Sequence, residues 1–264
     1  MAHKPRKRFG QNFLHDQNVI QRIVNAIAPQ KGEHLVEIGP GQGALTKQLL
    51  PLIGQMDAIE LDRDLLEPLR QTCASLGQLS IHSADALKFD FCSLLHAEEH
   101  KLRIVGNLPY NISTPLLFHL MEERHCIQDM HFMLQKEVVE RITAQPGNGQ
   151  YGRLSIMLQY YCQAEQLFIV SPGAFFPPPR VDSAVFRLIP RSTPLFTAKD
   201  EKLLSRVVSQ SFSQRRKTIR NNLKGVIEES VLLELDIDPG LRPERLGLEQ
   251  FVKLANWLAD NKMQ

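Results

Sequence analysis

The stretch His34-Leu35-Val36-Glu37-Ile38-Gly39-Pro40-Gly41-Gln42-Gly43 decides the fold of this chain. Its first half is a mostly apolar run typical of a buried strand, and its second half places glycines at alternate positions before a helical stretch that begins at Ala44. Alternate glycines permit a tight turn from strand to helix and let a ligand approach the backbone closely. The stretch therefore predicts a strand, a ligand-binding turn and a helix.

The spacing of these glycines indicates the kind of ligand. The dinucleotide pattern G-x-G-x-x-G is a near neighbour, but here Ala44 follows Gly43, so the pattern is not met. The observed spacing suits S-adenosylmethionine, which has no pyrophosphate to hold. We expect Gly39 and Gly41 to contact this cofactor, and Glu37 to act as an electrostatic partner of its sulfonium or amino group.

Acidic residues end the next two strands expected along the chain. Glu60 closes the strand 56–60, about twenty residues beyond the glycine turn, where this architecture places a carboxylate on the ribose hydroxyls. Asp85 and its neighbour Ala86 follow the strand 79–82, and Asp85 is expected to accept a hydrogen bond from the adenine amino group. Asp62 and Asp64 are interpreted as caps of the helix that follows them.

Strands and helices alternate along most of the chain. Strands are expected over 34–38, 56–60, 79–82, 102–106, 129–134, 165–170 and 183–189, and helices from Asp16 and over 44–52, 64–74, 115–123, 136–144 and 153–161. This pattern predicts the α/β class, with a Rossmann-like methyltransferase sheet of class I in residues 1–190. Beyond a boundary near Pro190 to Pro194 the pattern is helical, over 202–223, 231–235 and 248–260, so residues 195–264 are expected to form a small all-helical domain.

The tetrapeptide Asn107-Leu108-Pro109-Tyr110 follows the strand 102–106 and predicts the chemistry. The lone pair of an exocyclic amino group on a base is delocalised into the ring, so a methyltransferase must hold this nitrogen with hydrogen-bond acceptors. The side-chain oxygen of Asn107 and the backbone oxygen of Leu108 are suitable acceptors, because Pro109 removes a competing donor and favours an extended Leu108. Tyr110 is expected to stack on the base, which must leave its helix to be reached. The alternative interpretation is an ordinary turn after a strand.

A second aromatic candidate lies in the connection 171–180, where Pro172 and Pro177-Pro178-Pro179 disfavour a helix. We expect Phe175 to offer a second stacking face for the base, opposite Tyr110. The alternative is that Phe175 and Phe176 only fill the core, which is the interpretation we favour for Phe176.

Length and composition indicate a globular enzyme. A chain of 264 residues can bury a full core and carry a smaller second domain. Neither a membrane span nor the apolar core of a signal peptide is evident, so a soluble, cytoplasmic protein is expected. We also expect a monomer. The four cysteines are far apart and form no C-x-x-C pair, and we therefore expect reduced thiols and no metal site.

Basic residues gather in two places although the net charge is only +2. The first group contains Arg6, Lys7 and Arg8, and the second contains Arg215, Arg216, Lys217 and Arg220. The second group is expected on a helix whose apolar face is Val208, Phe212, Ile219 and Leu223. Such groups bind phosphate backbones, and together with the amino-methylation motif they predict a nucleic-acid substrate. The alternative for either group is a solvated helix face.

Taken together, these motifs resemble those of the KsgA/RsmA family of ribosomal RNA adenine dimethyltransferases, and the resemblance extends along essentially the whole chain. The segments that carry the resemblance are Arg6-Lys7-Arg8-Phe9-Gly10-Gln11-Asn12-Phe13-Leu14, Val36-Glu37-Ile38-Gly39-Pro40-Gly41, Ile59-Glu60-Leu61-Asp62, Asn107-Leu108-Pro109-Tyr110-Asn111-Ile112-Ser113, Phe132-Met133-Leu134-Gln135-Lys136-Glu137-Val138, Pro177-Pro178-Pro179-Arg180-Val181-Asp182-Ser183-Ala184-Val185 and Gln214-Arg215-Arg216-Lys217-Thr218-Ile219-Arg220-Asn221. The resemblance implies dimethylation of N6 on two adjacent adenosines in the 3′-terminal hairpin of 16S rRNA, within an assembling small ribosomal subunit. It also implies that Asn12 and Leu14 contact the cofactor.

Three rival interpretations remain. A dimethyltransferase of 23S rRNA, of the antibiotic-resistance type, shares the fold and the Asn-x-Pro-Tyr motif, although the segment Gln214 to Arg220 favours the small-subunit family. DNA adenine methyltransferases use a similar tetrapeptide but usually add a target-recognition domain, for which this chain has little room. From a different class, the protein could be chiefly an RNA-binding assembly factor whose methylation is secondary.

Overall fold

The computed structural model describes residues 11–95 and 100–261. Contacts within the chain define two compact units. The first holds the chain up to Val139 together with Gln163–Pro190, and the second holds Glu140–Cys162 together with the chain from Arg191. Residues 140–162, which the expected division leaves in the catalytic domain, therefore group with the C-terminal helices.

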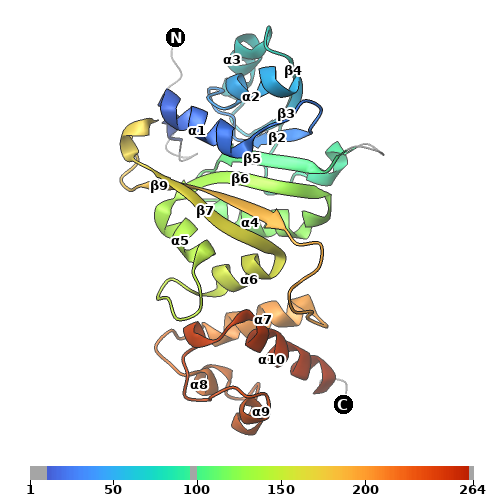
Figure 1. Cartoon of the computed structure of the whole chain (residues 1–264), viewed down its shortest axis with the longest axis vertical. Helices are drawn as coiled ribbons and strands as arrows, with labels where there is room; N and C mark the ends of the chain where they lie inside the picture. The colour runs from blue at the N-terminus through green and yellow to red at the C-terminus, as the bar shows by residue number, and fades with distance from the viewer. Residues whose placement is uncertain (1–10, 96–99, 262–264) are drawn as a thin grey trace. The chain divides into compact units, whose positions relative to one another are not determined.

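A seven-stranded sheet forms the centre of the first unit (Figure 1). Its strands, in spatial order, are β4 (Gln78–Ser83), β3 (Gln55–Glu60), β2 (Leu35–Ile38), β5 (Leu102–Asn107), β6 (Ile127–Gln135), β9 (Ser183–Pro190) and β7 (Cys162–Val170). The pairs from β4 to β6 are parallel, whereas β9 runs antiparallel to β6. The strand order reverses between β2 and β5, and open sheets of this kind bind ligands at such a point, beyond the carboxyl ends of the strands.

Helices follow most of these strands. They are α1 (Gln17–Ile27), α2 (Thr46–Ile53), α3 (Arg63–Cys73), α4 (Ser113–Glu122), α5 (Lys136–Thr143) and α6 (Arg153–Tyr161), with short 3-10 helices η2 (Phe91–Leu94), η3 (Arg124–Cys126) and η4 (Pro172–Ala174). The Asp16 carboxylate caps α1 by accepting hydrogen bonds from the N–H groups of Asn18 and Val19. The Asp62 carboxylate caps α3 in the same way through Asp64, which confirms the cap expected at Asp62.

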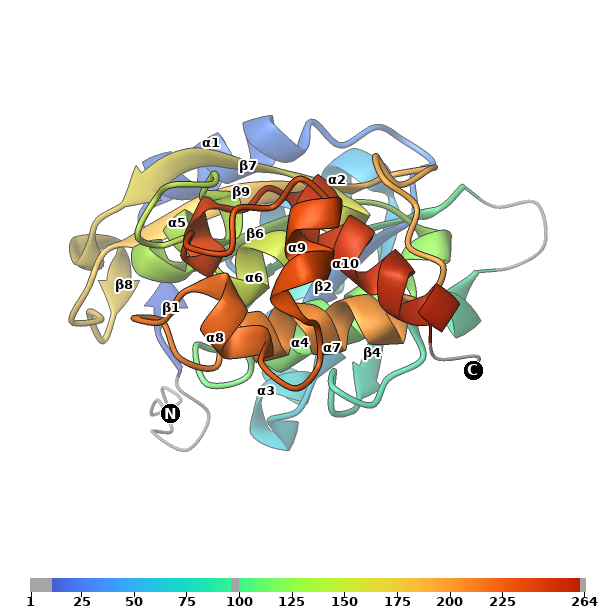
Figure 2. The ribbon, with the colours of Figure 1, turned by 90° about the horizontal axis from the view of Figure 1, so that it is seen from below.

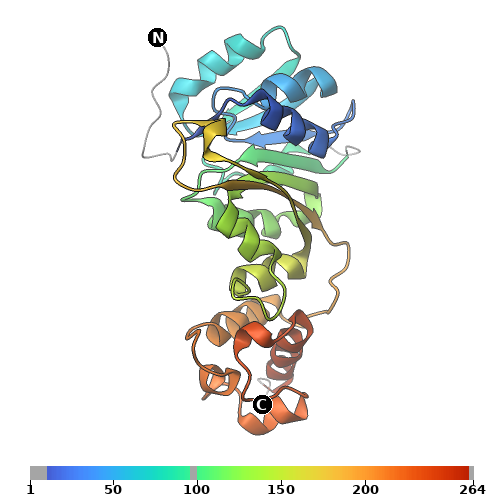
Figure 3. The same ribbon diagram turned by 60° about the vertical axis from the view of Figure 1, so that its left-hand side comes forward.

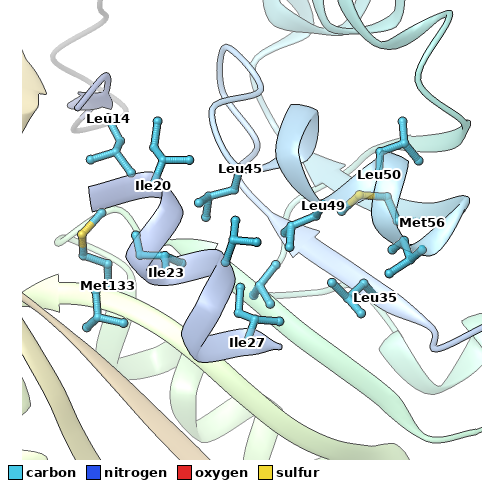
Figure 4. Close-up of a cluster of buried hydrophobic side chains, with 14 of the residues drawn as sticks. Leu14, Ile20, Ile23, Ile27, Leu35, Leu45, Leu49, Leu50, Met56 and Met133 are labelled. Carbon is cyan, nitrogen blue, oxygen red and sulfur yellow. The ribbon is translucent and has the colours of Figure 1, made fainter. Parts of the chain in front are cut away.

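One hydrophobic cluster fixes the helices on one face of the sheet (Figure 4). In α1, Ile20, Ile23 and Ile27 recur at helical spacing, so one stripe of the helix is apolar and packs against the sheet. Leu49 of α2 and Leu35 of β2 belong to the same cluster and are completely buried. Figure 2 shows α1 and α4 on opposite sides of the strands, as alternation of strand and helix predicts.

A two-stranded ribbon joins two segments that lie far apart in the sequence. Strand β1 (Phe13–Leu14) pairs antiparallel with β8 (Phe175–Phe176), with Phe13 opposite Phe176 and Leu14 opposite Phe175. Directly opposed side chains lie on the same face of an antiparallel pair, and successive ones alternate. One face of the ribbon therefore carries Leu14 and Phe175, which are buried in the core cluster, and the other carries Phe13 and Phe176.

From Arg191 to Asn261, the regular elements of the second unit are all helices (Figure 3). These are α7 (Glu201–Ser211), α8 (Ile219–Leu223), α9 (Glu229–Glu234), the short η5 (Pro243–Arg245) and α10 (Leu248–Asn261).

The single helix expected over 202–223 is wrong, because α7 ends at Ser211 and a turn precedes α8. The buried side chain of Asn222 stabilises this turn: its oxygen accepts hydrogen bonds from Ser213 and from the N–H of Gln214, and its amide donates to the carbonyl oxygen of Lys217. Ile219 is the first residue of α8 and is buried, so the apolar spacing is met without one continuous helix.

The cysteines depart from the sequence-based prediction. Cys92 of η2 and Cys126 of η3 form a disulfide across a separation of 34 residues, because the fold brings these two short helices together. Cys73 and Cys162 are buried and take no part in this disulfide. Over residues 11–95 and 100–261, no helix has both the length and the apolar character that a membrane span requires.

Candidate active site

A cavity of about 310 Å³ opens at the carboxyl ends of β2, β3 and β5, beside the reversal of strand order, and lies within the size range of small-molecule sites. Twelve residues predicted for the site line it: Asn12, Leu14, Glu37, Gly39, Gly41, Glu60, Asp85, Ala86, Asn107, Leu108, Pro109 and Tyr110. The structure thus brings together five segments that are separated along the chain. Their individual roles remain predictions.

The glycine turn forms the floor between β2 and α2. Gly39 and Gly41 have φ angles of +67° and +57°, in the region that favours glycine. A Cβ atom on Gly41 would lie 3.2 Å from the ring of Phe13, so a side chain there would press on the β1 segment. Phe13 also lines the cavity, and sequence reasoning missed it although its neighbours Asn12 and Leu14 were singled out. Its position opposite Phe176 becomes visible only once β1 and β8 pair.

Glu60 is held in one orientation at the end of β3. One carboxylate oxygen accepts a hydrogen bond from the N–H of Gly41 (3.2 Å), and the other accepts from the N–H of Asp62 (2.8 Å). Burial raises the pKa of Glu60, while these backbone hydrogen bonds act in the opposite direction. The carboxylate is therefore a preorganised acceptor beside the glycine turn, suited to a pair of hydroxyl groups.

Glu37 is the most deeply buried acid of the cavity lining, with 2% of its surface exposed. Burial raises its pKa to about 7; the hydrogen bond from the Thr46 hydroxyl (2.5 Å) lowers it, and the nearby Glu60 raises it further. The carboxyl group therefore titrates near neutral pH. A cation placed next to it would favour the charged form, as expected for a partner of a sulfonium or ammonium group.

At the end of β4, Asp85 and Ala86 form the wall of the cavity beyond β3. One oxygen of Asp85 accepts a hydrogen bond from the N–H of Leu87 (3.0 Å), which fixes the carboxylate at the start of a turn. Ala86 is buried and presents only a methyl group. A flat heterocycle with an exocyclic amino group fits this combination of a small apolar surface and one acceptor.

The tetrapeptide Asn107 to Tyr110 provides two acceptors next to the cavity. The Asn107 amide nitrogen donates a hydrogen bond to the backbone oxygen of Asn12 (3.1 Å), which fixes the amide and leaves its oxygen for another donor. The N–H of Leu108 donates to the carbonyl oxygen of Met133 (3.2 Å), and no hydrogen bond within the described part of the chain ends at the Leu108 carbonyl oxygen. The two oxygens expected to accept an amino group are therefore available.

A residue outside the tetrapeptide holds the Tyr110 ring. The Tyr110 hydroxyl lies 3.0 Å from the hydroxyl of Ser183, the first residue of β9, and burial raises the Tyr110 pKa. Sequence reasoning gave Ser183 no role. A polar residue at a strand end was the only local signal, because the contact spans 73 residues and depends on the antiparallel placement of β9.

The expectations for the two phenylalanines of β8 are both wrong: Phe175 was expected to offer a stacking face, and Phe176 to fill the core. Phe175 is 2% exposed and packs in the core cluster, whereas Phe176 is 64% exposed. The cause is the register of the β1–β8 ribbon, which places Phe175 beside Leu14 on the core face and Phe176 beside Phe13 on the other face. Phe175 therefore does not present a free stacking face.

The predicted RNA-binding residues lie in different environments. Arg215, Arg216 and Lys217 are exposed in the turn between α7 and α8, not on a helix, and Arg215 donates a hydrogen bond to the carbonyl oxygen of Gly149 (2.5 Å). Arg220 forms an ion pair with Glu229 (3.1 Å). The predictions for Arg6, Lys7 and Arg8 fall outside the described residues.

The lining of the cavity limits the chemistry. Among the described residues that line it there is no cysteine, serine, histidine or lysine, so it offers no ordinary nucleophile and no imidazole base. It offers buried or fixed carboxylates, side-chain amides, the Leu108 carbonyl oxygen and the aromatic rings of Phe13 and Tyr110. This set favours direct transfer between two bound molecules that the site aligns.

Comparisons with known proteins agree with this geometry. The family model described as ribosomal RNA adenine dimethylase matches residues 2–260. Proteins described as ribosomal RNA small subunit methyltransferase A are similar: that of Pseudomonas aeruginosa is 58% identical, covering 98% of this chain and 96% of the relative, and that of Aeromonas hydrophila is 56% identical, covering 99% and 97%.

Solved structures show the same fold. A dimethyladenosine transferase from Plasmodium falciparum has a TM-score of 0.78 at 26% identity, covering 92% of this chain and 95% of that one. The 23S rRNA methyltransferase ErmE has a TM-score of 0.71 at 25% identity, covering 94% and 100%. On the match of the family model and these identities, the chain belongs to the ribosomal RNA adenine dimethylase family.

Proposed function

We propose that this protein transfers methyl groups from S-adenosylmethionine to N6 of two adjacent adenosines in the 3′-terminal hairpin of 16S rRNA, as a cytoplasmic monomer acting on the assembling small subunit. The observation that carries the proposal is the Asn107 amide, whose nitrogen is bound by the backbone of Asn12 so that its oxygen is presented at the cavity. Membership of the family and the relatives' description as small-subunit methyltransferases support the choice of substrate.

The residues present fit S-adenosylmethionine. Glu60 would accept the ribose hydroxyls, Asp85 the adenine amino group, and the turn at Gly39 and Gly41 would pass close to the methionine part. When bound, this molecule supplies an electrophilic methyl group on a positively charged sulfur. The hydrogen bonds that fix Glu60 favour a site that is formed before binding.

The chain's own residues would position the adenine amino group. The Asn107 and Leu108 oxygens accept its two N–H bonds and favour a pyramidal nitrogen, which makes the lone pair available. Tyr110, held by Ser183, stacks on the flipped base. Alignment and exclusion of water supply most of the acceleration, and the proton leaves after the nitrogen has become cationic.

The second transfer to the same nitrogen needs only one acceptor, because the monomethylated amine has a single N–H. The amine must rotate after the first transfer, and the site must hold a methyl group where an N–H lay before. The Leu108 carbonyl and the Asn107 amide are the two places at which this exchange can occur.

The variant Asn107→Ala tests the catalytic proposal. It should bind S-adenosylmethionine with affinity close to that of the wild type, measured by calorimetry, and should lose methyl transfer in single-turnover assays on small-subunit particles. Asn111→Ala is the matched control, because Asn111 lines the cavity but lies outside the acceptor pair. Methyl transfer by Asn107→Ala at the wild-type rate would refute the proposed role.

The basic residues of the α7–α8 turn are proposed to bind the RNA backbone. Reversing the charge of Arg215 and Arg216 should weaken binding of the particle and flatten its dependence on salt, since fewer counterions are then released. Arg70→Glu is the control, because Arg70 is 59% exposed in the first unit. A salt dependence identical to that of the wild type would count against this patch.

The position of the methylated adenosines distinguishes the alternative substrates. These adenosines should be mapped in both rRNAs from cells with and without the gene. Loss of dimethylation in 23S rRNA instead of 16S rRNA would favour the resistance-type activity, which the likeness to the 23S rRNA methyltransferase ErmE leaves open. If a deletion and the Asn107→Ala variant differ strongly in ribosome assembly, the protein acts chiefly as an assembly factor.

A further inference from the structure

Two cysteines and a histidine meet outside the cavity, between two short helices. Cys92 lies in η2, after the connection that carries Asp85, and His125 and Cys126 lie in η3, after α4. We refer to Cys92, His125 and Cys126 as the dithiol–imidazole cluster. None of the three lines the cavity, and the proposed methyl transfer uses none of them.

The ligand atoms of the cluster lie close enough together to reach one metal ion once the disulfide is broken. The Sγ atom of Cys92 lies 3.4 Å from Nε2 of His125, and the two sulfurs and this nitrogen are all within 4.8 Å of one another. Two ligands of one tetrahedral zinc ion lie about 3.5 to 3.8 Å apart, given bonds of about 2.0 to 2.3 Å. The Cα atoms of the cysteines are 5.6 Å apart, so both thiolates can reach a single ion.

The surroundings of the cluster suit a cation. Cys126 is buried, Cys92 is half-buried and His125 is exposed, so one side is closed by protein and the other is open to entry. Carboxylate oxygens of Asp90 and Glu123 lie within 4.8 Å of the Cys92 sulfur and of each other, and they add negative charge and an oxygen donor. Each carboxylate also accepts a backbone hydrogen bond, from Ser93 and from Phe91, which fixes its place.

We propose that, when the disulfide is reduced, Cys92, Cys126 and His125 bind one zinc ion, with a carboxylate of Asp90 or Glu123 or a water molecule as the fourth ligand. Reduction takes two electrons and two protons, supplied by two thiol groups of a cellular reductant that are oxidised to one disulfide. Zinc then displaces both thiol protons to give two zinc–thiolate bonds. The ion clamps η2 to η3, and so fixes the connection that carries Asp85 against the end of α4.

Cobalt is the probe, because thiolate-bound cobalt gives a charge-transfer band in the near ultraviolet and tetrahedral cobalt a visible spectrum. The full-length protein, freed of metal and reduced with a phosphine, should give both bands, saturate at one equivalent and release the cobalt when zinc is added. The same protein with the disulfide intact should give neither band. Zinc should raise the melting temperature of the reduced form only.

Variants assign the ligands. Replacing Cys92 and Cys126 with serine should remove the charge-transfer band, although Cys73 and Cys162 remain, and His125→Ala should weaken cobalt binding on the order of tenfold or more. The control His100→Ala removes another exposed histidine and should change nothing. The proposal is overturned if reduced wild-type protein gives no thiolate band, or if the band persists in the double serine variant. A comparison of reduced with oxidised wild type stays decisive even if a variant fails to fold.

Discussion

Replacing Glu37 with glutamine gives the sharpest test of the electrostatics of the cavity. Glu37 belongs to β2, and its buried carboxyl group accepts a hydrogen bond from Thr46 at the start of α2. Its pKa is raised to about 7 from an ordinary value of 4.5, mainly by burial. Glutamine has nearly the same shape and can still accept the hydrogen bond from Thr46, but it cannot lose a proton. The substitution therefore isolates the free energy of charging this one group.

The magnitude follows from the two pKa values. At about 1.4 kcal/mol for each tenfold change in proton affinity, a rise from 4.5 to about 7 corresponds to about 3 kcal/mol. Between these pH values the folded state keeps a proton that the unfolded state releases, so the free energy of unfolding falls as the pH rises. We expect Glu37→Gln to gain about 3 kcal/mol of stability relative to the wild type between pH 4 and pH 8.

Two assays measure this effect. A carbon-13 titration of the glutamate carboxyl groups, with Glu37→Gln used to assign the resonance, should give a midpoint near 7. Urea unfolding at matched pH should be followed by circular dichroism, because the single tryptophan, Trp257, lies in the other unit and does not report on β2. Thr46→Val is the control: it removes the hydrogen bond that lowers the pKa, so the midpoint should rise further.

The same group should couple the binding of S-adenosylmethionine to pH. If the cation lies beside Glu37, its affinity falls below pH 7, by up to about tenfold at pH 6, and Glu37→Gln removes that dependence. The reasoning is refuted if the carboxyl titrates near 4.5, or if the stability difference between wild type and variant is constant from pH 4 to pH 8. A flat affinity with a midpoint near 7 would place the cation elsewhere.

Three further predictions use contacts that the fold creates. Ser183→Ala should lower the single-turnover rate about fivefold, the equivalent of one hydrogen bond, and adding Tyr110→Phe to it should cost nothing more if the two hydroxyls act as a pair. Phe175→Ala should lower the free energy of unfolding by about 3 to 5 kcal/mol, whereas Phe176→Ala should change it by less than about 0.5 kcal/mol, as urea titration would show. Asn222→Ala should destabilise the second unit by about 1 to 3 kcal/mol, measured by tryptophan fluorescence; an unchanged unfolding midpoint would contradict the role of Asn222 in the turn.

The sequence predicts those parts of this fold that depend on neighbouring residues. Strand β2, the glycine turn and α2 were predictable because apolar spacing, glycine and helix formers follow one another directly. The cap at Asp62 was predictable for the same reason, since a capping carboxylate binds an N–H group two residues further on. Because the strands are parallel, the residues that follow them meet at one edge, so the gathering of Glu60, Asp85 and Asn107 could also be predicted.

Features that depend on pairing between distant segments were not predictable. The Phe175 error came from a strand register that a two-residue ribbon sets with a segment some 160 positions away, and a shift by one residue would exchange the two faces. The disulfide between Cys92 and Cys126 required η2 and η3 to be adjacent, which no cysteine spacing reveals. The break after α7 was missed because apolar spacing continues across it. The hydrogen bonds that Asn222 makes to the turn come from a residue on the far side of the break and leave no periodic signal.

The ribbon of β1 and β8 also connects the two halves of the proposed mechanism. Asn12, next to β1, accepts the hydrogen bond that orients the Asn107 amide, so the position of the acceptor oxygen depends on the ribbon. The ribbon is in turn held by Phe175, whose ring is buried in the cluster that supports α1. Loss of the Phe175 ring would therefore disturb catalysis through the position of Asn107, even though the ring itself offers no face to the base. Phe175 is then a positioning residue, and its substitution should lower the transfer rate and the stability together.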